Sequence, residues 1–69
     1  MGASKIIKQL MQERNVSVKE LANELKINAQ SMSNKLYRDS FSYDEVITIA
    51  DILNSDVRII TRDTNKEFY

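Results

Sequence analysis

Apolar side chains recur at helical spacing over most of this chain, and they divide it into four predicted helices and a tail. The helices are predicted over residues 5–14, 18–25, 29–38 and 43–53, with a three-residue break at 26–28. In the tail the period changes to two, because Val57, Ile59 and Thr61 alternate with Arg58, Ile60 and Arg62, and this favours a strand. We therefore expect one mainly α domain over residues 1–69, with a helical core over 4–54 and a tail over 56–69 that forms a short β-strand or hairpin.

Polar residues at the expected helix starts support these boundaries. Ser17 with Glu20, and Ser42 with Glu45, have the spacing of capping boxes, in which each serine and glutamate satisfies a free backbone N–H. Asn28 is a favourable N-cap for the third helix. We expect these caps to fix where three of the four helices begin.

The spacing also predicts which side chains are buried in the first and fourth helices. Ser4 is expected to cap the first helix, whose inward face is Ile6, Ile7, Leu10 and Met11. The inward face of the fourth helix is expected to be Val46, Ile47, Ala50 and Leu53, with Ile49 and Ile52 on its flanks.

The third predicted helix carries a polar stripe on the side opposite its apolar residues. Gln30, Asn34 and Arg38 are four residues apart, whereas Met32 and Leu36 point the other way. Glutamine and asparagine can pair with adenine in the DNA major groove, and arginine can bind guanine or phosphate. A solvated helix face is the ordinary explanation of such a stripe, but residues 28–38 contain no acidic side chain. The pattern favours DNA contact.

Other side chains around this helix suit DNA as well. Ala29 is a candidate contact for a thymine methyl group, with packing inside the protein as an equal alternative. Gln30 and Asn34 are the other predicted base contacts. Tyr43 is either a phosphate donor or a partly buried anchor. The predicted DNA-backbone contacts are Ser17, Asn28, Ser31, Ser33, Lys35, Arg38 and Tyr43.

The charge distribution is uneven although the net charge is zero. Residues 1–38 hold seven basic and three acidic side chains, whereas residues 39–69 hold three basic and seven acidic ones. A basic half that contains the polar stripe suits docking on DNA from one side. An evenly mixed surface is the alternative interpretation.

Composition narrows the classes of function further. The chain has no cysteine and no histidine, so it lacks thiolate or imidazole metal ligands and a histidine base. We predict that it is not an enzyme and needs no cofactor or metal. No apolar run reaches the ~20 residues of a membrane span, and no signal-peptide core is present, so we predict a cytoplasmic protein without membrane contact.

Residues 6–54 resemble the helix-turn-helix of the Cro/C1-type (XRE-like) family of repressors. Leu21 and Ala22 match that family's Leu-Ala pair, and Leu25, Ile27 and Met32 match its next apolar positions. The resemblance implies a four-helix, lambda-repressor-like fold and sequence-specific binding of double-stranded DNA. It implies that residues 29–38 form the reading helix, meaning the helix that contacts base edges.

Three positions depart from the family pattern. Lys26 replaces the usual turn glycine, at a cost of about 1 kcal/mol if its backbone is left-handed. Val18 replaces a phosphate-binding glutamine, and Lys35 replaces an apolar anchor. These departures bear on the tilt of the reading helix and on one phosphate contact.

The tail is predicted to make a homodimer. An isolated strand leaves its backbone groups unpaired, so the segment from Val57 to Arg62 is expected to pair with the same segment of a second chain. The alternative is a hairpin within one chain, with its turn at residues 63–66 and Phe68 folded back on the core. The function predicted from these observations is a small transcriptional repressor; the alternative is a protein-binding module such as an antitoxin-like or anti-repressor domain.

Overall fold

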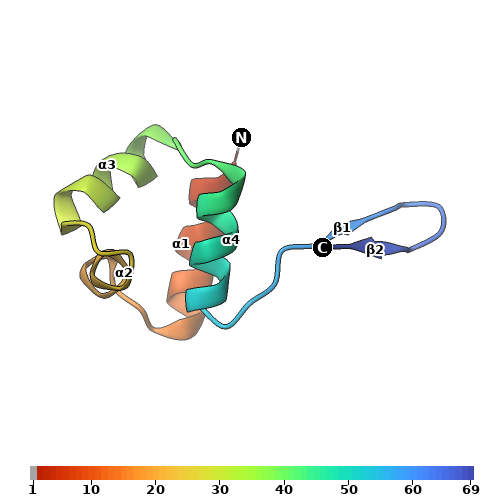
Figure 1. Ribbon diagram of the computed structural model, residues 1–69, viewed down its shortest axis with the longest axis horizontal. Coiled ribbons are helices and arrows are strands. Elements are labelled where there is room, and N and C mark those ends of the chain that lie inside the picture. The colour runs from red at the N-terminus through yellow and green to blue at the C-terminus, as the bar shows by residue number, and fades with distance from the viewer. Residues whose placement is uncertain (1) are drawn as a thin grey trace.

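The chain folds into four helices followed by a β-hairpin, as seen in a computed structural model that describes residues 2–69 (Figure 1). Met1, which the sequence analysis included in the single domain, lies outside the described residues. The elements are α1 (Ala3–Arg14), α2 (Val18–Glu24), α3 (Ala29–Arg38), α4 (Tyr43–Ile52), β1 (Ile59–Ile60) and β2 (Glu67–Phe68). The predicted fold class, a mainly α helix-turn-helix domain with a short C-terminal β-strand or hairpin, is confirmed, and the tail forms the hairpin.

One hydrophobic core joins all four helices. Leu21 of α2, Met32 of α3, Ile49 of α4 and Leu53 after α4 are its largest fully buried side chains. Ile7 of α1 packs into the same cluster. Replacing a fully buried leucine or methionine by alanine costs about 2–5 kcal/mol in such cores, so these contacts hold α2 and α3 against α1 and α4.

Local capping fixes the starts of α2, α3 and α4, as the sequence predicts. The Glu20 N–H donates to Ser17 Oγ at 3.1 Å, and the Ser17 N–H donates to Glu20 Oε1 at 3.2 Å. Ser42 and Glu45 form the same reciprocal box before α4. Asn28 Oδ1 accepts the Ser31 N–H at 2.7 Å at the start of α3. These bonds satisfy donors that a helix start otherwise leaves unpaired.

Left-handed residues end α1 and form the turn between α2 and α3. Asn15 has φ 56° at the end of α1. Lys26 has φ 59° in the turn of the motif. Lys26 thus adopts the left-handed turn conformation at the position where the family pattern has glycine, and its side chain adds a steric cost that glycine would not have.

The start and the exposed face of α1 differ from the prediction. The helix begins at Ala3 rather than Lys5, and Ser4 is a buried residue inside it rather than its cap. The cap comes instead from Asp39, whose Oδ1 accepts the Ser4 N–H at 2.9 Å. Ile6, expected inside, is 64% exposed. Burial of Ala3 rotates the inward stripe onto residues 3, 4, 7 and 11, which places Ile6 outside.

The inward face of α4 also differs from the prediction. Ile49 is 1% exposed, whereas Ile47 is 40% exposed. Val46, Ile49 and Leu53 follow one another at spacings of three and four residues, so they share one face of the helix. Ile47 is one residue away from Val46, about 100° around the axis, and faces outward.

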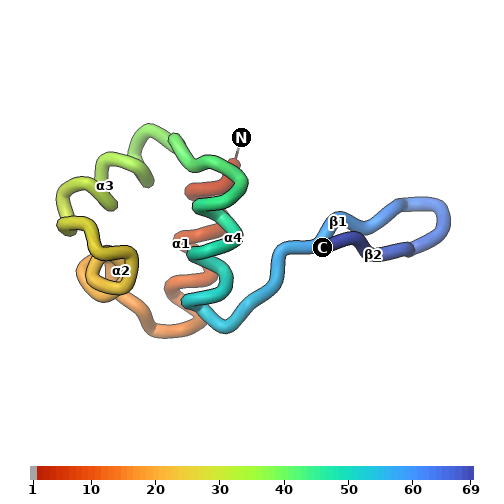
Figure 2. Tube along the Cα trace, viewed as in Figure 1, coloured from red at the N-terminus to blue at the C-terminus, as the bar shows by residue number. Residues whose placement is uncertain are grey.

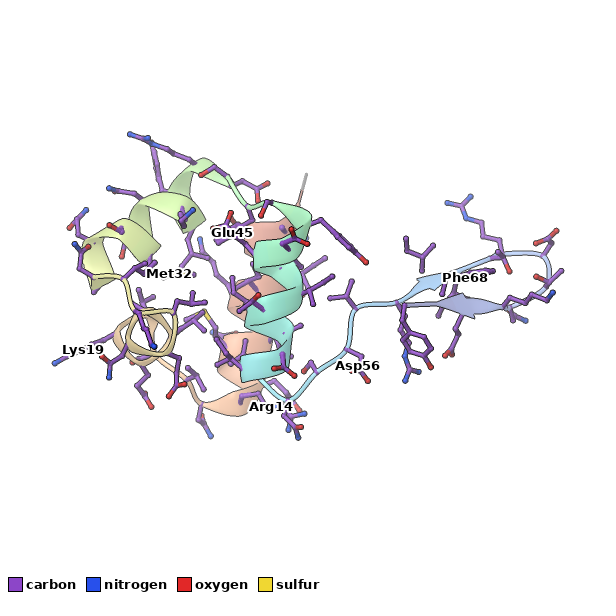
Figure 3. The ribbon with its side chains drawn as sticks, viewed as in Figure 1. Arg14, Lys19, Met32, Glu45, Asp56 and Phe68 are labelled. Carbon is purple, nitrogen blue, oxygen red and sulfur yellow. The ribbon has the colours of Figure 1, made fainter. Side chains whose placement is uncertain are left out.

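The hairpin extends away from the helices along the longest dimension of the molecule (Figure 2). β1 and β2 are antiparallel, with Ile59 opposite Phe68 and Ile60 opposite Glu67. Arg58 supports the pairing, because its guanidinium donates to Glu67 at 2.9 Å and lies 4.7 Å from the centre of the Tyr69 ring. The tail therefore forms the hairpin within one chain that the sequence analysis gave as the alternative, and β1 is not an isolated strand. Only the expected position of Phe68 is not seen, because this side chain is 56% exposed and lies far from the helical core (Figure 3).

Candidate nucleic-acid interface

The polar stripe predicted on α3 faces away from the core. Met32 lies on the inner side of the helix and is fully buried (Figure 3). Leu36 is also buried. Gln30, Asn34 and Arg38 are all exposed. α3 is therefore fixed by its apolar side and presents a continuous polar face to the surroundings.

Ala29 belongs to the open side of α3 rather than to the packed side. It is exposed at the first position of the helix, next to Gln30. The packing role that the sequence left open for Ala29 is therefore not seen, and its methyl group is accessible.

Gln30 and Asn34 are joined by a hydrogen bond that the sequence analysis did not predict. Gln30 Nε2 donates to Asn34 Oδ1 at 3.2 Å. The signal for it was present, since side chains four residues apart are neighbours on a helix surface and glutamine–asparagine pairs at this spacing form such bonds. The two amides therefore form one unit on the exposed face.

Two cap residues keep donors for a phosphate. Phosphate oxygens accept hydrogen bonds, so a protein group must donate to bind them. Ser17 Oγ accepts from the α2 backbone and Asn28 Oδ1 accepts from the α3 backbone. The cap bonds do not use the hydroxyl hydrogen of Ser17 or the side-chain NH₂ of Asn28. Each residue can therefore cap its helix and at the same time donate a hydrogen bond to a phosphate.

The other predicted backbone contacts lie at varied depths. Ser33 and Arg38 are exposed on α3, and Ser31 is partly buried. Tyr43, at the first position of α4, is 51% exposed, so its ring is neither buried nor free of the protein. The structure leaves each of these hydroxyl or guanidinium groups close to the surface.

Lys35 is engaged within the protein. Its Nζ lies 2.7 Å from Glu45 Oε2, and its partly buried side chain lines the same surface hollow as Leu25, Ile27 and Phe41. The hydrogen bond from Lys35, with a second from the Ser42 N–H, lowers the pKa of the Glu45 carboxyl below its ordinary value of 4.5. Lys35 thus directs its charge to α4, and its methylene groups are partly covered at the position where the family pattern has an apolar anchor.

Asp39 ties the end of α3 to the start of α1. Its backbone is left-handed, with φ 53°, and its carboxylate accepts the Ser4 N–H. That hydrogen bond is the main reason that the pKa of Asp39 lies below its ordinary value of 3.8. A carboxylate at a helix start also interacts favourably with the helix dipole, so the charged form stabilises this junction.

Comparison with known proteins gives one family. Residues 5–63 match the bacteriophage CI repressor helix-turn-helix domain. No curated protein and no solved structure matches the chain. Within residues 2–69, none of the helices combines the length and the apolar character needed to cross a membrane.

Proposed function

Because the chain belongs to the bacteriophage CI repressor helix-turn-helix family and is thus a DNA-binding transcriptional regulator, we propose that it is a sequence-specific repressor that reads the major groove with α3. This match over residues 5–63 confirms the family resemblance to Cro/C1-type repressors that the sequence shows over residues 6–54. The proposal places the protein on double-stranded DNA in the cytoplasm.

The observation that carries this proposal is the two-sided character of α3. Met32 and Leu36 anchor one side in the core, while Gln30, Asn34 and Arg38 are exposed on the other. A helix that enters the major groove needs such an anchored inner side and a polar outer side whose side chains reach base edges.

The proposed contacts follow from the groups that are accessible. We propose base contacts by Ala29, Gln30 and Asn34, and backbone contacts by Ser17, Asn28, Ser31, Ser33, Arg38 and Tyr43. Lys35 is proposed as a positioning residue, because its ammonium group is bound to Glu45.

We also propose that two copies act together through the tail. β1 uses one edge to pair with β2, and pairing with a second chain would use its other edge. Ile59 and Ile60 are exposed, so a second β1 beside the first would cover apolar surface as well as pair backbone groups. A twofold contact of this kind, from Val57 to Arg62, would present two reading helices to two half-sites.

Selection of bound duplexes from a random DNA pool tests the central proposal. We expect one enriched sequence, with Gln30→Ala and Asn34→Ala each weakening its binding by about 1–3 kcal/mol and changing random-DNA binding little. Asn23→Ala, an exposed asparagine on α2, is the matched control. Equal losses on selected and random duplexes would remove both residues from the reading role, and no salt-dependent DNA binding at all would favour a protein-binding module.

A further inference from the structure

The hydrogen bond between Gln30 and Asn34 makes their two amides unequal. Both side chains are exposed on the same face of α3, and the bond runs from Gln30 Nε2 to Asn34 Oδ1. The direction matters because an amide nitrogen only donates and an amide oxygen only accepts. Each residue therefore offers a different set of groups to a DNA base.

Gln30 keeps what adenine requires. Pairing with the adenine edge in the major groove takes one acceptor, for the N6 amino group, and one donor, for N7. Gln30 donates one of its two Nε2 hydrogens to Asn34 and retains Oε1 and the second hydrogen. The bond to Asn34 therefore leaves Gln30 with one acceptor and one donor.

Asn34 is left mainly as a donor. Its Oδ1 is engaged by Gln30, whereas both hydrogens of Nδ2 are free of that bond. An adenine N6 amino group would have to share Oδ1 with Gln30. Guanine O6 and N7, or thymine O4, are acceptors that the Asn34 amino group can meet without competition.

We propose that Gln30 and Asn34 act as one unit that reads adenine with Gln30 and an acceptor base, guanine or thymine, with Asn34. This inference rests on the proposed function, because it assumes that α3 lies in the major groove. The two residues are about 6 Å apart along the helix axis, so they address neighbouring base pairs. Cytosine, which offers an N4 donor in the groove, is the base that Asn34 excludes most strongly.

The experiment is parallel selection from a random duplex pool with wild-type protein and four variants. Gln30→Ala and Asn34→Ala identify the base position that each side chain reads, because that position loses its preference. Asn34→Asp keeps an oxygen that accepts from Gln30 but removes the donors. Asn23→Asp makes the same chemical change on α2, away from α3, and controls for the added negative charge. Circular dichroism melting checks that every variant is folded.

We expect the wild type to select adenine at the Gln30 position and guanine or thymine at the Asn34 position, with cytosine there disfavoured about tenfold. In Asn34→Asp the preferred base at that second position should change to cytosine, because aspartate accepts from its N4 group, while adenine at the first position is retained. Asn23→Asp should select the wild-type sequence.

Adenine at the Asn34 position of the wild-type sequence would overturn the inference and leave the proposed function standing. So would an Asn34→Asp selection without the change to cytosine. A wild-type pool with no enriched sequence would overturn the proposed function itself, and the inference with it.

Discussion

Lys35 of α3 and Glu45 of α4 form an ion pair with 2.7 Å between Nζ and Oε2. Glu45 also caps α4 through Ser42, so one carboxylate joins the start of α4 to the middle of α3. α3 is therefore joined to α4 partly by a charge, at a position where the resemblance to the family implies an apolar residue.

Replacing Lys35 tests whether this residue positions α3 or binds a DNA phosphate. Lys35→Met keeps an apolar stem and removes the charge. We expect the salt dependence of DNA binding to keep its slope, with a loss of at most about 1 kcal/mol in the free energy of unfolding, because the pair is partly exposed. Arg38→Ala is the comparison, and should make the slope shallower by about one unit. The same change of slope in Lys35→Met would show instead that Lys35 holds a phosphate, as the sequence predicts.

Acid should weaken the fold through Asp39 and Glu45. The pKa of each carboxyl is lowered in the folded chain, by the Ser4 N–H and by Lys35 respectively, so the unfolded chain binds more protons as the pH falls. Their contribution is present above the ordinary values of 3.8 and 4.5 and is lost as the pH falls through the lower folded values. We expect the melting temperature to fall between about pH 5 and pH 3.

Two variants assign that dependence to these residues. Asp39→Asn and Glu45→Gln keep an oxygen that can accept the same backbone bonds but remove the titrating group. Each should flatten the pH profile of the melting temperature, and the double variant should flatten it further. A double variant with the wild-type profile would place the acid sensitivity elsewhere in the chain.

A glycine in the motif turn should stabilise the protein. Lys26 has φ 59°, a conformation that glycine adopts without the steric cost of a side chain. We expect Lys26→Gly to raise the free energy of unfolding by about 1 kcal/mol in urea titrations. Lys8→Gly, inside α1 and exposed, is the matched control and should lower it by about 1 kcal/mol. A loss in both variants would mean that the Lys26 side chain contributes more than its backbone strain costs.

Removal of the hairpin tests the proposed dimer. A chain ending at Ser55 keeps all four helices and their caps. We expect the full chain to sediment as a dimer at tens of micromolar and the shortened chain as a monomer with much weaker binding to a two-half-site operator. Ile60→Lys in the full chain should also give a monomer, because a charge on β1 opposes edge pairing. A full chain that is already monomeric without DNA would overturn pairing through Val57 to Arg62.

The helix starts could be read from the sequence because their causes are local. Ser17, Asn28 and Ser42 each act on a backbone group three residues away, and nothing distant competes with them. The bounds of α3 and the exposure of Gln30 and Asn34 follow from the same short-range pattern. For this reason the candidate interface on α3 could be predicted from the sequence.

The start of α1 could not be predicted from local sequence. Its cap, Asp39, is 35 residues away from Ser4 in the chain, so no local motif announces it. The same limit applies to Lys35, whose partner Glu45 lies on another helix. Periodicity also left the inward faces of α1 and α4 uncertain by one or two positions. Ile6 beside Ile7, and Ile47 near Ile49, fit a helical pattern about equally well until the neighbouring helices are placed.

The hairpin and α3 lie at opposite ends of a molecule 41 Å long, so the proposed DNA contacts and the proposed dimer contact are on separate surfaces (Figure 1). In the proposed dimer, the operator is filled by a species whose amount grows with the square of the monomer concentration while monomers predominate. A twofold rise in synthesis of the chain then gives nearly a fourfold rise in the species that occupies DNA. The exposed isoleucines of β1 would thus set the protein level at which repression begins.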